Sequence, residues 1–250
     1  MNQSTMEHPK VVTQKEWIAA RKELLAKEKS LTRQRDALAE ERRSLPWVKV
    51  DKKYEFETAS GKKTLAELFG GKSQLAIYHF MLGPDWEQGC PGCSLLGDHL
   101  DGMGIHLAQR DVRLLIVSRA PLDRIEAFKK RMGWKFPWVS SYGSDFNFDY
   151  GVSVAKEDMG KELIYNYKPT KFPSDERPGM SVFYMNANGE VFHTYSMYGR
   201  GLEDLMGIYV ILDRVPKGRD EGGLPTPMAW LRHHDRYPEG NIVEVKAAKT

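Results

Sequence analysis

The chain has 250 residues and a formal net charge of +3, from 37 basic and 34 acidic residues. A chain of this length can bury a substantial core, and no polybasic block is present to neutralise a phosphate backbone, so nucleic acid is not an expected partner. The first residues are polar, and no segment is long and apolar enough to cross a bilayer. We therefore expect a cytoplasmic protein without a membrane partner.

Residues 13–43 predict one long amphipathic helix, because they are rich in helix formers and contain neither Gly nor Pro. An apolar side chain recurs at every seventh position: Trp17, Leu24, Leu31 and Leu38. Such a narrow stripe suits packing along another surface. We expect an arm docked on its own domain, with a homodimer contact as the alternative.

The next part of the chain predicts short elements that lead to a central strand. Residues 47–58 alternate apolar and polar around a turn-prone Asp-Lys-Lys, which favours a β-hairpin. Residues 60–71 favour a helical turn that ends at Gly70 and Gly71. The apolar run at 73–82 is typical of a buried strand, and it leads directly to the cysteines.

A βαβ unit follows from the order of the next patterns. Residues 94–110 favour a helix, weakened by Gly102 and Gly104, and residues 111–119 favour a second buried strand. The two strands flanking the cysteine loop and this helix are then expected to be parallel, with a right-handed crossover.

The second half of the chain predicts helix, hairpin and helix. Residues 122–133 favour a helix that stops at Gly133, residues 180–196 favour two strands around Asn188 and Gly189, and a last helix is expected at 202–212. Together with the βαβ unit, this order predicts a thioredoxin-like α/β fold, in which helices flank a central mixed sheet.

The only two cysteines, Cys90 and Cys93, lie in the stretch EQGCPGCSLLGDHL at the expected strand-to-helix junction. If Cys90 begins the helix, the free amide groups and the helix dipole stabilise its thiolate, which is the attacking species. Cys93, one turn inside, can then resolve a mixed disulfide. Pro91 suits the first helical turn, and Gly92 leaves that turn uncrowded.

The pair has two alternative uses, a metal site and an inert buried pair. A structural zinc site needs four ligands, and a second Cys pair or a suitably spaced His pair is missing, since His233 and His234 are adjacent. The pair could also be inert and buried. Because cytoplasmic thiols are kept reduced, redox chemistry is the favoured interpretation, with no metal and no tightly bound cofactor.

The segment ASGKKTLAELFGG, followed by a strand and a cysteine loop, resembles the opening of the peroxiredoxins. That family carries a Pro-x-x-x-Thr-x-x-Cys pattern whose threonine hydroxyl helps bind peroxide. Here Pro84 precedes Cys90 by six positions, and Gln88 stands where the hydroxyl residue would be sought. The difference weakens the expectation of a peroxidase without removing it.

Longer motifs carry a second resemblance, from about Trp17 to Tyr237. The stretches YHFMLGPDW, CPGC, VSRAPLDRIEAFKKRMGWKFPWVSSYGSDFNFDYGV, GMSVFYMNANGEVFHTYSMYGRG and GRDEGG resemble the thioredoxin-like family catalogued as domain of unknown function 899. The resemblance implies a predicted dithiol-disulfide oxidoreductase. Thioredoxins place a cis-proline before the strand that faces the active site, whereas here Pro178 lies early, so we expect Met180 or Gly179 to face the cysteines.

Several further residues could contribute to the site. Trp86 could cover the disulfide, and Asp85 and Glu87 could accept protons from Cys93, although a solvated loop is the favoured interpretation for the acids. For His193 and Tyr195, expected on one face of a strand, a satisfied core histidine is favoured. Arg177 is expected to be a surface charge rather than a partner of Cys90.

An aromatic-rich segment at 134–150 could line a ligand pocket, but a packed cap over the sheet is the favoured expectation. Its rings belong to Trp134, Phe136, Trp138, Tyr142, Phe146, Phe148 and Tyr150. The tail residues His233, His234 and Asp235 receive no catalytic role, because adjacent residues rarely face the same way.

We therefore predict a helical arm at 1–45, a thioredoxin-like domain at 46–215 and a C-terminal extension at 216–250 packed on or trailing the domain. The predicted function is thiol-disulfide oxidoreduction, with Cys90 and Cys93 catalytic and with Trp86, Pro91, Gly92 and Met180 binding substrate. The partners are a disulfide substrate and a thiol reductant, thioredoxin or glutathione. Alternatives are a redox-sensing or ligand-binding module without turnover, and a peroxiredoxin-like peroxidase.

Overall fold

The computed structural model describes residues 9–238. Residues 1–8, part of the polar start of the predicted arm, and residues 239–250, the end of the predicted C-terminal extension, lie outside the described residues. The chain divides into two compact units, Met1–Pro46 and Trp47–Thr250, which are treated separately below.

The first unit contains the helix α1 (Gln14–Arg43), which confirms the long helix predicted from the sequence. Its start is fixed by a capping box, in which the Thr13 hydroxyl accepts from the Glu16 N–H while the Glu16 carboxylate accepts from the Thr13 N–H. The expected contact with its own domain, or with a second copy, stays a prediction.

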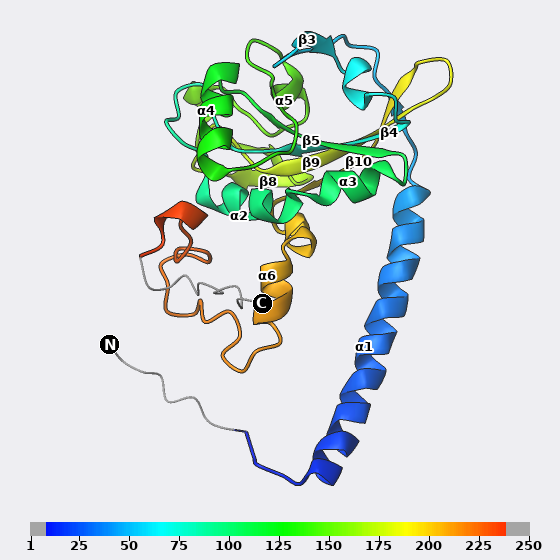
Figure 1. Ribbon diagram of the computed structural model, residues 1–250, viewed down its shortest axis with the longest axis vertical. Helices are drawn as coiled ribbons and strands as arrows, with labels where there is room; N and C mark the ends of the chain where they lie inside the picture. The colour runs from blue at the N-terminus through cyan, green and yellow to red at the C-terminus, as the bar shows by residue number, and fades with distance from the viewer. Residues whose placement is uncertain (1–8, 239–250) are drawn as a thin grey trace, which may run out of the picture. The chain divides into compact units, whose positions relative to one another are not determined.

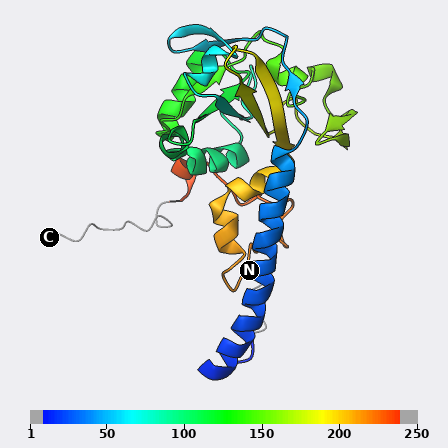
Figure 2. The same cartoon turned by 90° about the vertical axis from the view of Figure 1, so that its right-hand side faces the viewer.

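The second unit is built on an eight-stranded mixed sheet with the order β1-β10-β9-β4-β5-β6-β2-β3. Strands β4, β5 and β6 are parallel, and every other pairing in this sheet is antiparallel. The strands are β1 (Val48–Lys49), β2 (Glu55–Thr58), β3 (Gly61–Thr64), β4 (Gln74–His79), β5 (Val112–Ser118), β6 (Trp138–Ser140), β9 (Gly179–Met185) and β10 (Val191–Tyr198). A separate hairpin of β7 (Glu162–Tyr165) and β8 (Lys168–Lys171) projects from the sheet (Figure 2).

Short helices cover both faces of the sheet, with α2, α3 and α6 on one side and α5 on the other (Figure 1). The α-helices of this unit are α2 (Pro91–Leu100), α3 (Met103–Ala108), α4 (Leu122–Met132), α5 (Phe146–Asp149) and α6 (Gly207–Leu212). The 3-10 helices are η1 (Glu67–Phe69), η2 (Lys156–Asp158), η3 (Gly199–Leu205) and η4 (His234–Arg236). None of the helices between residues 9 and 238 is long and apolar enough to cross a membrane.

Two apolar cores lie on the two faces of the sheet, because successive side chains of each strand point in opposite directions. On β4, Ile77 enters one core and Tyr78 the other. The Tyr78 core is closed by α2, α4 and α6, and it contains Cys93. The opposite core is closed by η1 and α5.

The connectivity confirms the predicted fold class. Strand β4 leads through α2 to the parallel strand β5, while β9 and β10 form an antiparallel hairpin on the other side of β4 and are followed by α6. This arrangement of a βαβ unit, an antiparallel hairpin and a final helix is thioredoxin-like. The predicted strand at 73–82, the helix stop at Gly133 (φ 70°) and the hairpin at 180–196 are all confirmed.

The hairpin predicted within residues 47–58 is wrong. Strand β1 pairs with β10, and the Val50 N–H donates to the Val191 carbonyl, so the chain continues past Asp-Lys-Lys without turning back. The hairpin is formed instead by β2 and β3. The Thr58 hydroxyl closes its turn by donating a hydrogen bond to the Gly61 carbonyl at 2.7 Å. Gly61 has a φ of 97°, which its lack of a Cβ permits.

Three further expectations need correction. The helix predicted over 94–110 breaks at Gly102 (φ 88°), and the last helix begins as η3 and is interrupted at Met206. The expected packing of the aromatic segment against the sheet is confirmed for most of its rings, but they do not form one cap, because the segment contributes to both cores. Trp134, Phe136 and Trp138 lie on the Cys93 side and Phe146 and Tyr150 on the other, while Tyr142 and Phe148 are exposed.

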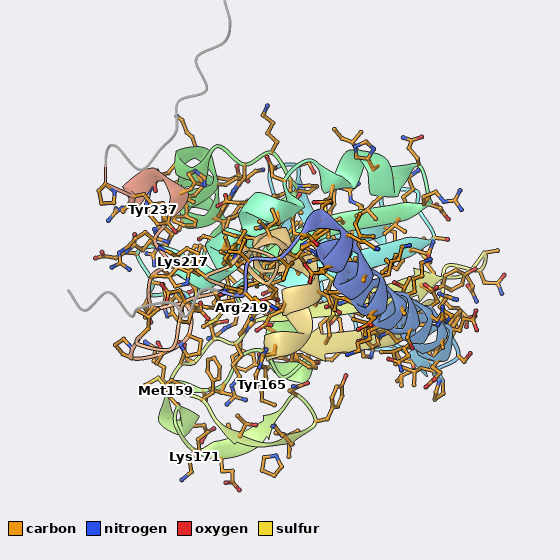
Figure 3. All side chains as sticks on the ribbon, turned by 90° about the horizontal axis from the view of Figure 1, so that it is seen from below. Met159, Tyr165, Lys171, Lys217, Arg219 and Tyr237 are labelled. Carbon is orange, nitrogen blue, oxygen red and sulfur yellow. The ribbon has the colours of Figure 1, made fainter. Side chains whose placement is uncertain are left out.

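The chain after α6 returns along that helix. Arg219, labelled in Figure 3, lies 4.3 Å from the centre of the Tyr209 ring and forms an ion pair with Asp213. Glu221 accepts hydrogen bonds from the Trp230 indole and the Met228 N–H. These contacts hold the segment around Met228, and the Met228 methyl group lies beside Gly92 of α2.

Candidate functional site

The cysteine pair lies where the chain passes from β4 into α2. The Phe80 N–H donates to the Val117 carbonyl of β5, and the Cys90 N–H donates to the Met81 carbonyl, so the loop begins on the sheet and its end is bonded back to its beginning. Cys90 is the residue that caps α2, and Pro91 occupies the first helical position. Both thiols are free. The predicted position of the pair at a helix N-terminus is therefore what the structure shows.

Cys90 is partly exposed and its thiolate is stabilised. The Cys93 thiol donates a hydrogen bond to the Cys90 sulfur, and the backbone N–H groups of Cys93 and Gly92 also donate to it. These contacts outweigh the desolvation of the charge and lower the pKa of Cys90 to about 6. The group is therefore mostly thiolate at neutral pH.

Cys93 has the opposite character. It is buried, with 3% of its surface exposed, and the Met81 N–H lies 3.5 Å from its sulfur. Burial, followed by the hydrogen bond to Cys90, raises its pKa well above the usual thiol value. Contacts with the Tyr78 hydroxyl and the Met81 N–H act the other way, because they favour the thiolate. One thiol is thus ionised and accessible, and its neighbour is protonated and enclosed.

Tyr78 was not singled out in the sequence. It lies on β4 in the core that contains Cys93, is 1% exposed, and its hydroxyl contacts the Cys93 sulfur. A tyrosine in an apolar strand carries no local signal of such a role. Only the alternation of β4 combined with the position of α2 identifies the side chain that faces Cys93.

The C-terminal segment also reaches the cysteine loop, which sequence reasoning missed. The His233 ring is buried and its Nε2 hydrogen-bonds the Gly89 carbonyl at 2.8 Å. The Met228 methyl group would lie 3.3 Å from a Cβ placed on Gly92. Burial lowers the pKa of His233, so the ring is neutral and Nε2 can donate. Two residues of the predicted extension therefore border the Cys-x-x-Cys turn.

Met180 and Trp86 lie in the same core as the cysteines. Met180 of β9 is paired with Tyr78 of β4 and is buried in the core that contains Cys93. Trp86 is partly buried against that core, and its carbonyl accepts from the Arg124 guanidinium. Gly179 instead packs closely against the Tyr198 ring, which leaves no room for a Cβ.

The two acids that precede the cysteines, Asp85 and Glu87, lie at exposed positions. Asp85 is exposed and forms an ion pair with Lys156, and Glu87 is exposed. The favoured interpretation of a solvated loop is thus consistent with their positions. A buried acid lies close by instead: Glu176 accepts from Arg119 at 2.6 Å, and burial raises its pKa to about 7.

The expectation that Arg177 is a surface charge is wrong. Its side chain is 1% exposed and its guanidinium lies 5.3 Å from the centre of the Tyr165 ring and 5.7 Å from that of Phe172. The Arg177 N–H donates to the Val152 carbonyl, which holds the backbone beside this aromatic pair. Cation–π contacts thus take the place of an acidic partner, and this pairing was not visible in the sequence.

His193 is a satisfied core histidine, as favoured. Its Nε2 lies 2.7 Å from the Ser196 hydroxyl, Ser196 contacts Ser181 at 2.8 Å, and Ser181 contacts His79 at 2.9 Å. This chain of hydrogen bonds lies on the face of the sheet opposite Cys93. A register shift between His193 and Tyr195 breaks the simple alternation expected for these two residues.

No three His, Cys, Asp or Glu side chains between residues 9 and 238 are grouped so that they could hold a metal ion. The features that do come together are a thioredoxin-like fold, a Cys-x-x-Cys turn at a helix N-terminus and two thiols with opposite pKa shifts. They place the chain in the thioredoxin-like class. The sequence matches the family described as bacterial protein of unknown function (DUF899) over residues 6–237, and the chain belongs to that family.

Solved structures with a similar fold include peroxiredoxin Q of Xanthomonas campestris, at 16% identity, with 70% of this chain and 99% of that chain covered and a TM-score of 0.44. The peroxidoxin BcpB of Mycobacterium tuberculosis is 12% identical, with coverages of 65% and 94% and a TM-score of 0.43. A hypothetical protein of Sinorhizobium meliloti 1021 is 18% identical, with coverages of 74% and 91% and a TM-score of 0.41. Likenesses at this level do not define an activity. No curated protein matches the sequence.

Proposed function

We propose that the protein is a dithiol-disulfide oxidoreductase that uses Cys90 as the nucleophile and Cys93 as the resolving thiol. The observation that carries the proposal is the difference between the two sulfurs. Cys90 is partly exposed, accepts hydrogen bonds at the start of α2 and has a pKa of about 6, whereas Cys93 is buried and its pKa is raised. An accessible thiolate beside a protonated thiol is what thiol–disulfide exchange requires.

In the first step the Cys90 thiolate attacks one sulfur of a substrate disulfide. A bond forms between Cys90 and that sulfur, the substrate S–S bond breaks, and the other substrate sulfur leaves as a thiolate. The Cys90 sulfur no longer carries a negative charge in the mixed disulfide. The charge that raised the pKa of Cys93 is then gone.

In the second step Cys93 loses its proton to solvent and attacks the Cys90 sulfur. The Tyr78 hydroxyl and the Met81 N–H donate to the Cys93 sulfur and stabilise the thiolate as it forms. The mixed disulfide breaks, the second substrate thiolate leaves, and a Cys90–Cys93 disulfide remains. Two electrons have passed from the dithiol to the substrate.

An external dithiol or two monothiols must return the pair to its reduced form, and we propose thioredoxin or glutathione for this role in the cytoplasm. The electron pair is stored in the two sulfurs, so the proposed reaction needs no bound cofactor. Pro91, exposed beside Cys90, and Gly92 would border the substrate, while Trp86 and Met180 support the pair from the core.

The test is turnover of bis(2-hydroxyethyl) disulfide by the full chain, with glutathione, glutathione reductase and NADPH in one series and with thioredoxin, thioredoxin reductase and NADPH in the other. The wild-type protein is expected to turn over with at least one donor. Cys90→Ser should be inactive, and Cys93→Ser should retain one substrate half as a stable mixed disulfide on Cys90, visible by mass spectrometry.

Two outcomes would overturn the proposal. Full turnover by Cys90→Ser would show that Cys90 is not the nucleophile. Oxidation of the wild-type pair once per chain, with no turnover by either donor, would support the redox-sensing or ligand-binding module instead.

A peroxide experiment separates the proposal from a peroxidase. Loss of one donor that stabilises developing charge costs about 10²- to 10³-fold in other enzymes. No hydroxyl residue stands at the motif position here, whether it is counted from Cys90, which gives Glu87, or from Pro84, which gives Gln88. We expect hydrogen peroxide to oxidise Cys90 no faster than a free thiolate. A much faster reaction in stopped-flow measurements, lost in Cys90→Ser, would favour the peroxidase.

A further inference from the structure

A cavity of about 510 Å³ opens at the end of the sheet opposite the cysteine pair. Its lining includes Lys72, just before β4, Val112 at the start of β5, and Pro137, just before β6. Parallel strands begin at the same edge of a sheet, whereas the cysteine loop follows the end of β4. The cavity therefore lies at the N-terminal ends of these strands, and its other wall is formed by α3.

Much of the cavity wall is apolar. Its apolar side chains are those of Ile105, Ala108, Val112, Leu114, Phe136 and Pro137. Ile105 is 71% exposed although it stands among these residues on α3. An exposed large apolar side chain on the wall of a hollow, rather than on a convex surface, provides contact area for an apolar ligand.

Three cations line the same cavity: Lys72, Arg113 and Lys135. Within residues 9–238, no salt bridge is formed by any of the three. Arg113 Nε is buried and has no hydrogen-bond partner in this part of the chain. The guanidinium lies across Gly70, since a Cβ there would approach its Nη1 to 2.2 Å.

Asp101 is the one acid of the lining, and it is already engaged. Its Oδ1 accepts from the Lys135 N–H at 2.8 Å and from the Phe136 N–H at 3.1 Å. These bonds fix the loop that carries Lys135 and Phe136. The lining thus presents three cations against one acid that is used to shape the wall, which gives it an excess of positive charge.

We propose that this cavity binds an amphiphilic carboxylate, a short aliphatic chain with one anionic end. The chain would lie against Ile105 and its apolar neighbours, and the carboxylate would accept from Arg113, whose planar donors match the two carboxylate oxygens. The site lies at the opposite end of α2 from Cys90 and needs neither thiol, so it goes beyond the proposed redox function.

The first test is a calorimetric titration of the full-length protein with sodium octanoate, with 1-octanol and sodium hexanoate as comparisons. Octanoate is expected to bind saturably at one site. Each methylene that leaves water is expected to tighten binding about fourfold, so hexanoate, with two methylenes fewer, should be about 15-fold weaker. Octanol lacks the charged end and should also be about tenfold weaker, because hydrogen bonds to charged groups are the stronger ones.

Three variants locate the site. Ile105→Glu places an acid on an exposed position of the wall and should weaken octanoate binding at least tenfold. Arg113→Gln should weaken octanoate about tenfold and leave octanol unchanged. Ile164→Glu, at a residue that is 65% exposed on β7, is the matched control and should bind octanoate like the wild type. Thermal unfolding checks that each variant is folded.

The proposal is overturned if octanoate gives no saturable binding, if octanol binds equally tightly, or if Ile105→Glu has no effect. Sedimentation gives a further outcome: a dimer that Ile105→Glu abolishes would show that a second copy of the chain covers this surface instead. Octanoate binding by Cys90→Ser should equal that of the wild type, which separates this site from the redox proposal.

Discussion

Tyr78 and His79 are neighbours on β4, and each is 1% exposed, yet the two faces that they enter differ in kind. The Tyr78 hydroxyl contacts the Cys93 sulfur, next to the partly exposed Cys90. The His79 ring stacks near Phe146 and hydrogen-bonds Ser181 within a chain of buried side chains. Burial of a titratable group is therefore common to both faces, and the presence of a partly exposed thiol distinguishes the Tyr78 face.

The two lowered pKa values show the same contrast. The pKa of Cys90 is about 6 because hydrogen bonds stabilise its charged form, so the group is ionised at neutral pH. The pKa of His79 is about 3 because burial destabilises its charged form, so the ring is neutral. A pKa shift in the same direction thus favours an anion on one face and a neutral side chain on the other.

The largest expected effect is the loss of folding stability that His79 causes at acid pH. The unfolded chain takes up a proton on this residue below about pH 6.5, but the folded chain does so only near pH 3. The unfolded state binds more protons within this window, so stability falls as the pH falls. Between pH 7 and pH 5 the loss due to His79 should be about 2 kcal/mol.

Urea unfolding of the wild type and of His79→Gln at both pH values measures this loss. The variant should show a pH-dependent loss that is smaller by about 2 kcal/mol, while alkylation of Cys90 stays unchanged. An equal pH dependence in the two proteins would show that the ring is protonated in the folded state.

The next effect concerns Cys90. At pH 5 a thiol with a pKa of about 6 holds roughly 300-fold more thiolate than a free thiol, and its lower nucleophilicity offsets about 15-fold of this advantage. Iodoacetamide should therefore alkylate Cys90 about 20-fold faster than free cysteine at pH 5. The measurement is the pH profile of labelling, followed by peptide mapping.

The profile should rise around pH 6, and Cys93 should stay unlabelled over this range. First labelling of Cys93, or reaction of both thiols only near pH 8.5 as for free thiols, would reverse the assigned roles.

Tyr78→Phe removes one hydroxyl from the cysteine face and retains the ring. Loss of a hydrogen bond to a charged group should slow the attack of Cys93 on the mixed disulfide about tenfold. Single-turnover release of the second substrate thiol measures this step. Ser181→Ala, which removes one hydroxyl from the His79 face, is the control and should leave the rate unchanged. Equal slowing in both variants would mean that the effect is structural.

The smallest effect is expected where the C-terminal segment meets the cysteine loop. His233→Leu removes the hydrogen bond to the Gly89 carbonyl and should lower the free energy of unfolding by about 1 kcal/mol. Alkylation of Cys90 should quicken only a few-fold. His234→Leu, which removes an exposed contact with Asp98, should change neither quantity. A matching loss in both variants would contradict a specific role for His233.

The parts of this molecule that follow from local chemistry were predictable. The apolar runs of β4 and β5 indicate buried strands, Gly133 ends α4 in a left-handed conformation, and a Cys-Pro-Gly-Cys turn after a strand indicates a helix start. The location of the cysteine pair follows from these patterns. The pKa shifts of Cys90 and Cys93, in contrast, depend on burial and hydrogen bonds that only the folded structure shows.

The features that were missed depend on contacts between distant segments. Arg177 follows two acids and reads as a surface charge, but rings from another part of the chain enclose it. Val48 and Lys49 pair with β10, which no local pattern indicates. The same holds for His233, which lies 144 positions from the carbonyl that it contacts.

The close approach of Met228 to Gly92 also limits how the Cys-x-x-Cys turn can diverge during evolution. An alanine at position 92 would have to displace the flexible end of Met228 by only a small distance, since its Cβ would lie 3.3 Å away. A longer side chain that points the same way would have to displace more of the Met228 side chain. Substitutions at position 92 alter the environment of the thiols. They are therefore tied to changes at Met228, more than a hundred residues away. We expect the two regions to vary together.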